Sequence, residues 1–198
     1  MDKELKIILS TNSPRRIELF RKICNEFEIY KQCYIEDDNY FINPQKLVLL
    51  NSSNKARNAN SNITKNNCII ISADTIVALK NRIYGKPENK EKAVNMLKNL
   101  SSKSHFVFTG VTIILRLKNK TQEINFFEKT EVIFNLIPEE DIIDYVNTYN
   151  PIDKAGAYGI QEIPASFIKK IDGDYDNVIG LPVARLKDVL DNILKNNF

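Results

Sequence analysis

The sequence has little of the chemistry that several common classes of protein require. It contains one histidine, His105, which cannot by itself supply the ligands of a zinc site, and no nucleophile elbow accompanies it. We therefore expect His105 to be structural. The three cysteines, Cys24, Cys33 and Cys68, are odd in number and widely spaced. This pattern argues against a disulfide framework or a metal knuckle and favours reduced thiols.

Long apolar runs and a large excess of one charge are also missing. No apolar run is long enough to span a bilayer, and the net charge of +3 is too small and too dispersed to indicate a nucleic-acid binder. The charged start, residues 1–4, is not followed by the apolar region of a signal peptide. We therefore expect a cytoplasmic protein with neither a membrane nor a nucleic acid as partner. No GxxxxGK[ST] loop occurs, which excludes a P-loop.

What is present is the composition of an ordinary soluble globular protein, with 43% hydrophobic and 27% charged residues. A chain of 198 residues can form one domain, or two lobes around one cleft. We expect residues 1–198 to form a single domain of this kind.

Apolar periodicity predicts where the helices and strands lie. Strands are expected at 5–10, 28–35, 68–73, 76–79, 82–84, 105–117, 122–136 and 166–171. Helices are expected at 14–25, 44–61, 89–100, 138–149 and 181–195. The continuous apolar run 68–73 is typical of a strand covered on both faces, and 76–79 with 82–84 should form a hairpin. Early alternation of strands and helices, followed by a long hairpin, predicts an α/β protein with a mixed sheet.

The segment after the first strand carries a possible anion site. Ser13 suits the N-cap of a helix and Pro14 its first position, so free N–H groups face the carboxyl end of a strand. Arg15 and Arg16 follow in the first turn, where the helix dipole disfavours cations. Such a pair either binds an anion, of which phosphate is the natural one, or is simply solvated.

Asp74 follows the buried strand 68–73 directly. At the carboxyl end of a strand, where open α/β sheets place functional groups, it could hold a divalent cation or accept a proton from water. The alternative is an aspartate that caps a turn. Lys86 lies between Gly85 and Pro87, which would fix it better than a flexible loop would, although a turn this short is weak support.

The densest polar segment is residues 153–161, which holds two of the six glycines. It indicates a loop whose backbone approaches a ligand closely, or else a structural turn. The segment 177–182 reads as a junction between a strand and a helix. With a single structural histidine, the catalytic chemistry left is that of carboxylates, lysine and arginine, which suits metal-assisted phosphoryl or nucleotidyl hydrolysis.

Seven short segments, in order and spacing, resemble the Maf family of nucleotide pyrophosphatases. They are Leu9 to Arg16, Asn54 to Ala56, Ala73 to Thr75, Gly85 to Pro87, His105 to Val111, Asp153 to Gln161 and Asn177 to Pro182. The resemblance covers nearly the whole chain. It implies an elongated mixed α/β fold with flanking helices, similar to the inosine-triphosphate pyrophosphatases, with two lobes around a nucleotide-binding cleft.

The resemblance also implies an activity: hydrolysis of nucleoside triphosphates to the monophosphate and pyrophosphate with Mg²⁺, Mn²⁺ or Co²⁺. Arg15, Arg16 and residues 154–161 resemble the branch that prefers dTTP and UTP, sometimes CTP, and modified pyrimidine nucleotides. Such enzymes clean the nucleotide pool. Members of the family often form dimers, so a homodimer is an expectation as well.

Roles for individual residues follow from the same resemblance. The residues implied to bind the substrate are Ser13, Arg15, Arg16, Lys55 and Thr75, and those implied in catalysis are Asp74, Lys86 and Gln161. Asp74 would hold the metal or deprotonate the attacking water, and Asp37, with Glu36 beside it, would complete the metal shell. Lys86 would neutralise charge on the phosphates, and Gln161 would orient the water or a phosphate oxygen.

The sequence departs from the family pattern in places. Thr11 replaces the first serine, and residues 162–165 replace glycines, so the loop geometry there is expected to differ. Two alternative functions stay open. One is a pyrophosphatase for the purine nucleotides ITP and XTP, and the other is a nucleotide-binding regulator of cell division or septation without relevant turnover.

Overall fold

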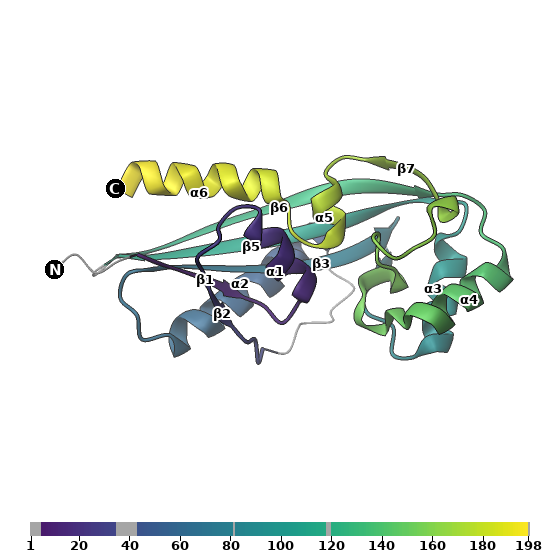
Figure 1. Cartoon of the computed structure of the whole chain (residues 1–198), viewed down its shortest axis with the longest axis horizontal. Helices are drawn as coiled ribbons and strands as arrows, with labels where there is room; N and C mark the ends of the chain where they lie inside the picture. Colours follow the sequence, from purple (N-terminus) through teal and green to yellow (C-terminus); the bar gives the residue numbers. More distant parts are fainter. Residues whose placement is uncertain (1–4, 35–42, 81, 118–119, 198) are drawn as a thin grey trace.

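The computed structural model describes residues 5–34, 43–80, 82–117 and 120–197. The helices are α1 (Pro14–Arg21), α2 (Pro44–Asn62), α3 (Lys90–Leu100), α4 (Glu139–Tyr149), α5 (Tyr175–Ile179) and α6 (Val183–Asn197). The strands are β1 (Lys6–Ser10), β2 (Glu28–Tyr30), β3 (Cys68–Leu79), β4 (Arg82–Tyr84), β5 (Ser104–Leu117), β6 (Lys120–Phe134) and β7 (Ile168–Asp172). The molecule is elongated, with α6 near one end and α3 and α4 at the other (Figure 1).

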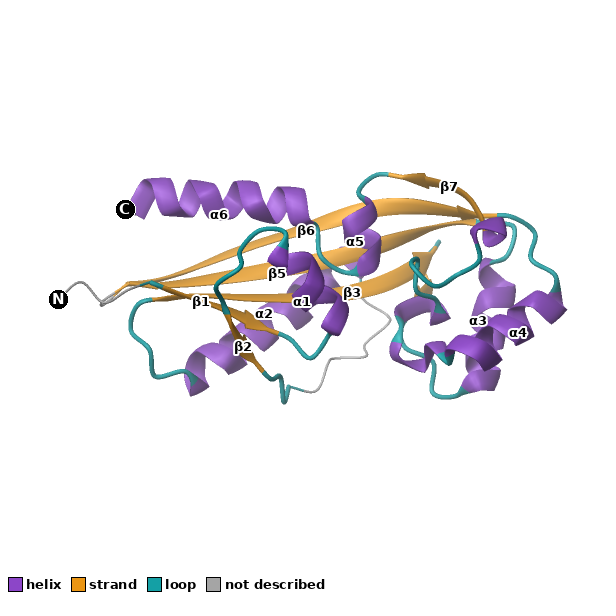
Figure 2. Ribbon diagram, viewed as in Figure 1, coloured by secondary structure: helices purple, strands orange, loops and turns teal. Residues whose placement is uncertain are grey.

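The strands form one mixed sheet in the order β2-β1-β3-β5-β6-β7, and β4 pairs with β3. β1 runs parallel to β2 and to β3, whereas the remaining pairs are antiparallel. The long strands β5 and β6 run along most of the molecule (Figure 2). The expected fold class, an elongated mixed sheet with flanking helices, is therefore confirmed. None of the helices within the described residues is long and apolar enough to cross a membrane.

The side chains of β3 alternate between two helical layers. Ile69 and Ile71 pack in the same cluster as residues of α1 and α6, whereas Cys68 and Ile70 pack against α2. Because neighbouring strand residues point to opposite faces, the unbroken apolar run fills both layers at once. A separate cluster, which includes residues of α3 and α4, packs around the other end of the sheet.

The strand β3 is longer than the sequence indicated. We expected separate strands at 68–73 and 76–79, but Cys68–Leu79 is one continuous strand. Its parallel neighbour β1 pairs with it only as far as Ser72, and β4 begins to pair at Val77. Between these two partners, one edge of β3 is paired with no strand among the described residues. That gap of four residues, 73–76, is where the cleft described below lies.

Other boundaries differ for local reasons. Helix α1 ends at Arg21 rather than at residue 25, because the N–H of Lys22 bonds to the carbonyl of Leu19 and tightens the last turn. Strand β2 covers only Glu28–Tyr30 of the expected 28–35. The remaining expected helices and strands lie within two residues of the observed bounds.

Helix α5 was not expected from the sequence. It is only five residues long, and the side chain of Asp174 stabilises its start by accepting hydrogen bonds from the N–H groups of Asp176 and Asn177. A helix this short has no apolar periodicity to detect, and its capping residue is the only local signal.

Gly110 allows α2 to lie directly on the sheet. It pairs with Asp74 across the β3–β5 ladder. A Cβ atom at Gly110 would lie 2.4 Å from the carbonyl oxygen of Val48 in α2, which is closer than real Cβ atoms approach. The backbone of α2 therefore packs against the one position in β5 that has no side chain, beside Asp74.

We predict that Gly110→Ala destabilises the protein by about 1–3 kcal/mol, because the added methyl group must push the backbone of α2 away from β5. Urea denaturation of the two proteins measures the change in the free energy of unfolding. Gly159→Ala is the matched control, since its added Cβ meets the flexible side chain of Lys154 instead of backbone. Equal stability losses in the two variants would contradict this account of Gly110.

His105 is fully buried in β5, and its Nε2 atom lies 2.8 Å from the hydroxyl oxygen of Tyr158. Burial lowers the pKa of His105 to about 4, because the charged imidazolium would be cut off from water. The expectation that this histidine is structural agrees with its place in the core.

The low pKa of His105 predicts a loss of stability in acid. In the unfolded chain the imidazole takes up a proton near pH 6.5, whereas in the folded chain it stays neutral down to about pH 4. Stability from this source is complete above pH 6.5 and falls by about 3 kcal/mol as the pH drops towards 4. Urea unfolding between pH 7.5 and 4.5 should show this component in the wild type and not in His105→Gln. Parallel pH profiles would contradict the assignment.

Candidate active site

A cleft of about 320 Å³ opens along the unpaired edge of β3. Its volume is within the range of pockets that bind small molecules. The cleft brings together eight of the residues selected from the sequence: Ser13, Arg15, Arg16, Lys55, Asp74, Thr75, Lys86 and Gln161. Asp37 and Glu36, expected to take part in metal binding, lie outside the described residues.

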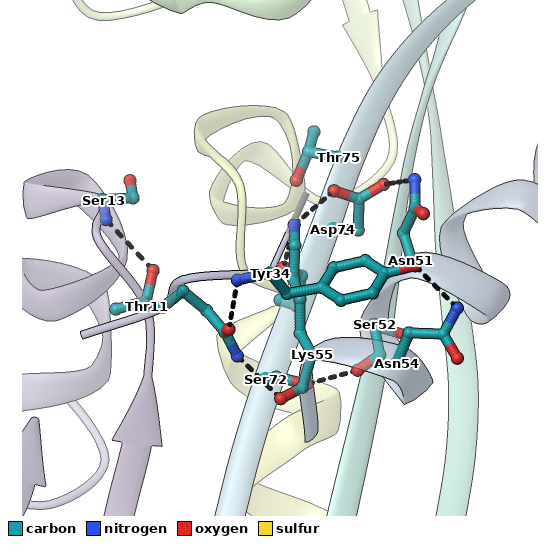
Figure 3. Close-up of polar contacts among 12 residues, drawn as sticks. Thr11, Ser13, Tyr34, Asn51, Ser52, Asn54, Lys55, Ser72, Asp74 and Thr75 are labelled. Atoms are coloured by element: carbon teal, nitrogen blue, oxygen red, sulfur yellow. Dashed lines mark hydrogen bonds and ion pairs between the residues drawn. The ribbon is translucent and has the colours of Figure 1, made fainter. Parts of the chain in front are cut away.

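At the centre, helix α2 holds both carboxylate oxygens of Asp74 (Figure 3). The Nζ atom of Lys55 lies 2.7 Å from Oδ1, and the Nδ2 atom of Asn51 donates to Oδ2 at 3.2 Å. Asn51, Lys55 and Asp74 are each at most 4% exposed. Because Asn51 and Lys55 are four residues apart on one helix, they face the strand together. The carboxylate is thus fixed in orientation and its charge is balanced.

The position of Asp74 follows from the alternation along β3. Ile70, Ser72 and Asp74 share the face of the sheet that α2 covers, and the hydroxyl of Ser72 donates to the carbonyl of Ser52 in α2 at 2.6 Å. The expectation that Asp74 lies at the end of its strand is wrong, since β3 continues to Leu79. It does lie just beyond the end of the parallel pairing with β1.

Arg16 reaches the cleft from the opposite face of the sheet. Its Nε atom donates to the carbonyl oxygen of Gly180 and its Nη2 atom to the hydroxyl of Thr75, both at 2.9 Å. The hydroxyls of Thr75 and Thr109 are 3.0 Å apart on neighbouring strands. Gly180 has φ of +131°, a conformation that L side chains rarely adopt. The junction between α5 and α6 therefore positions the guanidinium of Arg16.

The start of α1 is built as the sequence predicts. The side chain of Ser13 accepts a hydrogen bond from the N–H of Arg16, and Pro14 is the first helical residue. The Nη1 atom of Arg15 lies 3.2 Å from a carboxylate oxygen of Asp153, a residue distant in the sequence that also lines the cleft. Both arginines of the pair thus line the cleft, and each has a defined protein partner.

Lys86 and Gln161 are exposed side chains on two loops that border the cleft. The loops are joined, because the N–H of Gly156 donates to the carbonyl oxygen of Gly85 at 3.0 Å. Nearby, the hydroxyl of Tyr145 accepts a hydrogen bond from the N–H of Gly159 at 3.1 Å. These hydrogen bonds hold the segment 153–161 beside the cleft, and a Cβ atom at Gly156 would lie only 2.8 Å from the side chain of Val77.

Sequence reasoning missed a group of amide side chains at the cleft. Gln32 donates through Nε2 to Ser10 Oγ at 2.7 Å and to the carbonyl of Lys55 at 2.6 Å. The side-chain amide of Asn12 exchanges two hydrogen bonds with the backbone of Gln32, as a further strand residue would. These contacts tie the chain after β2 to β1 and to α2. The prediction from sequence missed these contacts because it assigned residues 28–35 to one strand, whereas Gln32 lies beyond the end of β2.

Asn51 was also missed, although a signal was available. It lies one helical turn before Lys55 on the predicted helix, and polar residues at that spacing share a face. Tyr34 gave no such signal. Its hydroxyl accepts a hydrogen bond from Asn54 Nδ2 at 2.9 Å and lines the cleft (Figure 3).

The donor set suits a metal ion that is coordinated partly by the protein and partly by a phosphate-bearing molecule bound in the cleft. Within the described ranges, no three acidic, histidine or cysteine side chains converge on one point. Asp74 contributes a single carboxylate, and Mg²⁺ in phosphate chemistry is commonly held by one or two carboxylates together with phosphate oxygens and water. Asp74 therefore fits a divalent cation that binds together with a polyphosphate.

The lining of the cleft combines two kinds of surface. The cationic side chains are those of Arg15, Arg16, Lys55, Lys86 and Lys154. The apolar or aromatic side chains include those of Tyr34, Val77, Val107, Tyr158, Ile160, Val178 and Ile179. A ligand with a polyanionic chain and a flat, less polar group would match both parts.

A family model and individual relatives agree on which proteins this chain is similar to. Residues 6–193 match the family described as Maf-like protein. The chain is 48% identical to a dTTP/UTP pyrophosphatase of Thermosipho melanesiensis, covering 94% of this chain and 97% of the relative. It is 46% identical to a dTTP/UTP pyrophosphatase of Carboxydothermus hydrogenoformans, covering 92% and 95%.

Among solved structures, a HAM1 protein from Coxiella burnetii matches with a TM-score of 0.54 and 16% sequence identity. The match covers 96% of this chain and all of the other. At this low identity the likeness concerns the fold, and it agrees with the elongated mixed α/β architecture.

We predict that Lys55→Met lowers the free energy of unfolding by about 3–5 kcal/mol, because it leaves the carboxylate of Asp74 buried without its cation. The double variant Lys55→Met/Asp74→Asn should recover part of this loss, since it removes the uncompensated charge as well. Urea denaturation of the three proteins provides the test. A double variant less stable than Lys55→Met would show that the charge of Asp74 is not the source of the loss.

Proposed function

The chain belongs to the Maf family, and from this premise we propose that it hydrolyses pyrimidine nucleoside triphosphates to the monophosphate and pyrophosphate. The observation that carries the proposal is the fixed carboxylate of Asp74, which lies in one cleft with Arg15, Arg16 and Lys86. The names of the relatives support dTTP and UTP as substrates. CTP and modified pyrimidine nucleotides remain further candidates, and the role would be to clean the nucleotide pool.

The two surfaces of the cleft suggest how a nucleotide binds. The triphosphate would lie against the arginine pair and Lys86, with the N-terminus of α1 and the hydroxyl of Ser13 adding hydrogen-bond donors. The nucleoside would lie against the apolar wall, with Gln161 between the two parts. Thr75 would act on the substrate through Arg16, since its hydroxyl holds that guanidinium.

In the proposed reaction, water attacks the α-phosphorus, the bond to the bridging oxygen breaks, and pyrophosphate leaves. Asp74 either accepts the proton of the attacking water or holds the cation, and Lys55 and Asn51 keep its carboxylate oriented for this task. Arg15, Arg16 and Lys86 would neutralise charge that develops on the leaving group. Gln161 would orient the water or a phosphate oxygen.

A divalent cation completes this proposal. Asp74 would hold it together with the phosphate oxygens, and Asp37 would contribute a second carboxylate. When bound, Mg²⁺, Mn²⁺ or Co²⁺ would neutralise negative charge on the phosphates of the substrate.

Three expectations from the sequence remain proposals. Residues 1–198 would act as a single unit, the protein would work in the cytoplasm, and two copies would form a homodimer. Light scattering coupled to size-exclusion chromatography measures the molecular mass and so tests the dimer directly.

We predict that Asp74→Asn lowers the rate of pyrophosphate release from dTTP or UTP by a factor of about 10²–10⁴, because it removes the base or metal carboxylate. Release should be measured on a panel of canonical and modified nucleoside triphosphates with each of the three cations. Thermal melting of the variant is needed beside it, since Lys55 loses its charged partner. Asn51→Leu serves as a milder comparison that removes the hydrogen bond to Asp74 but no charge.

Full activity of folded Asp74→Asn would overturn the assignment of Asp74. Preference for ITP or XTP over dTTP would favour the purine pyrophosphatase instead. Tight binding of dTTP in Mg²⁺ without release of pyrophosphate by the wild type would favour the binding regulator of cell division or septation.

A further inference from the structure

Four charged side chains form a continuous chain, and three of them, Arg15, Asp153 and Lys154, line the cleft. Arg15 Nη1 lies 3.2 Å from Asp153 Oδ2, and Lys154 Nζ lies 2.9 Å from the other oxygen, Asp153 Oδ1. Lys154 Nζ also lies 3.1 Å from Glu162 Oε2. The chain therefore runs from the first turn of α1 to the loop that follows α4. Cations and anions alternate along it, and Asp153 sits between two cations.

The members of this chain differ in exposure. The side chain of Lys154 is 8% exposed, so it anchors Asp153 from inside the protein. The side chains of Arg15 and Asp153 are 27% and 59% exposed, so their contact lies where a ligand in the cleft can reach it. An ion pair this exposed is weak enough to be exchanged. The contact with Lys154 does not depend on Arg15, because it uses the other carboxylate oxygen of Asp153.

Asp153 is ionised at neutral pH. Its partial burial favours the neutral carboxyl, but Lys154 and Arg15 outweigh this and lower the pKa of Asp153 below its ordinary value. The carboxylate is therefore a permanent negative charge at the wall of a cleft whose other charged groups include Arg15, Arg16, Lys55 and Lys86.

We propose that Asp153 competes with phosphate groups for Arg15 and so weakens the retention of phosphate-bearing ligands, the pyrophosphate product included. This inference rests on the proposed function, in which Arg15 binds the triphosphate. Any ligand that engages Arg15 must displace the carboxylate, and after the reaction the carboxylate takes the guanidinium back. Asp153 is thus a residue that sets affinity and eases product release.

The test is isothermal titration calorimetry with inorganic pyrophosphate and Mg²⁺ on the full chain. Asp153→Asn keeps the shape and an oxygen that can accept from Arg15, but removes the charge. We expect it to bind pyrophosphate about two- to five-fold more tightly than the wild type, which corresponds to about 0.4–1 kcal/mol. The inhibition of nucleotide turnover by pyrophosphate should strengthen by the same factor.

Glu162→Gln is the matched control, because it makes the same change in net charge and also removes a partner of Lys154, but it has no contact with Arg15. Its affinity for pyrophosphate should stay within about 1.5-fold of the wild type if long-range charge contributes little. The double variant Arg15→Gln/Asp153→Asn should bind pyrophosphate no more tightly than Arg15→Gln, because the guanidinium for which Asp153 and phosphate compete is absent from both.

A gain of affinity distinguishes competition from a structural role, because damage to the site would weaken binding. If Asp153→Asn binds pyrophosphate no more tightly than the wild type, Asp153 does not compete for Arg15, and the proposal is wrong. Weaker binding would indicate that Asp153 orients Arg15 for the ligand. An equal gain in Glu162→Gln would also overturn it. Failure of the proposed function looks different: the wild type would release no pyrophosphate from any nucleotide, or Arg15→Gln would bind pyrophosphate as the wild type does.

Discussion

The buried ion pair between Lys55 and Asp74 is the interaction on which the site depends. Removing two charges from water is costly, and the pair persists only because its geometry is fixed. Gly110 lets the backbone of α2 approach the sheet, and the alternation of β3 turns Asp74 towards that helix. Asn51 then holds the second carboxylate oxygen. Fold and site are therefore parts of one arrangement.

The second constraint is the gap in strand pairing along β3. Because β1 pairs no further than Ser72 and β4 starts at Val77, the edge between them is left for a ligand. Neighbouring residues of the strand point to opposite faces, so Asp74 meets α2 while Thr75 meets Arg16. One short stretch of strand thus presents a carboxylate on one face of the sheet and holds a guanidinium on the other, which suits a metal-assisted reaction of a polyphosphate.

Local patterns in the sequence predicted much of this arrangement. The N-cap at Ser13, the helix that carries Lys55 and the long hairpin of β5 and β6 depend on neighbouring residues and are found as expected. The continuity of β3 was missed, because its polar residues resemble a turn until their partners on both faces are known. Asn51 and Gln32 act through contacts between distant segments, which the sequence of either segment does not contain.

In the proposed reaction, water attacks the α-phosphorus of a pyrimidine nucleoside triphosphate in this cleft. The most direct measurement is ³¹P NMR of the products formed from UTP in ¹⁸O-labelled water with Mg²⁺. The account predicts uridine monophosphate that carries the label, together with unlabelled pyrophosphate. Label on the pyrophosphate, or the formation of uridine diphosphate and orthophosphate, would contradict it.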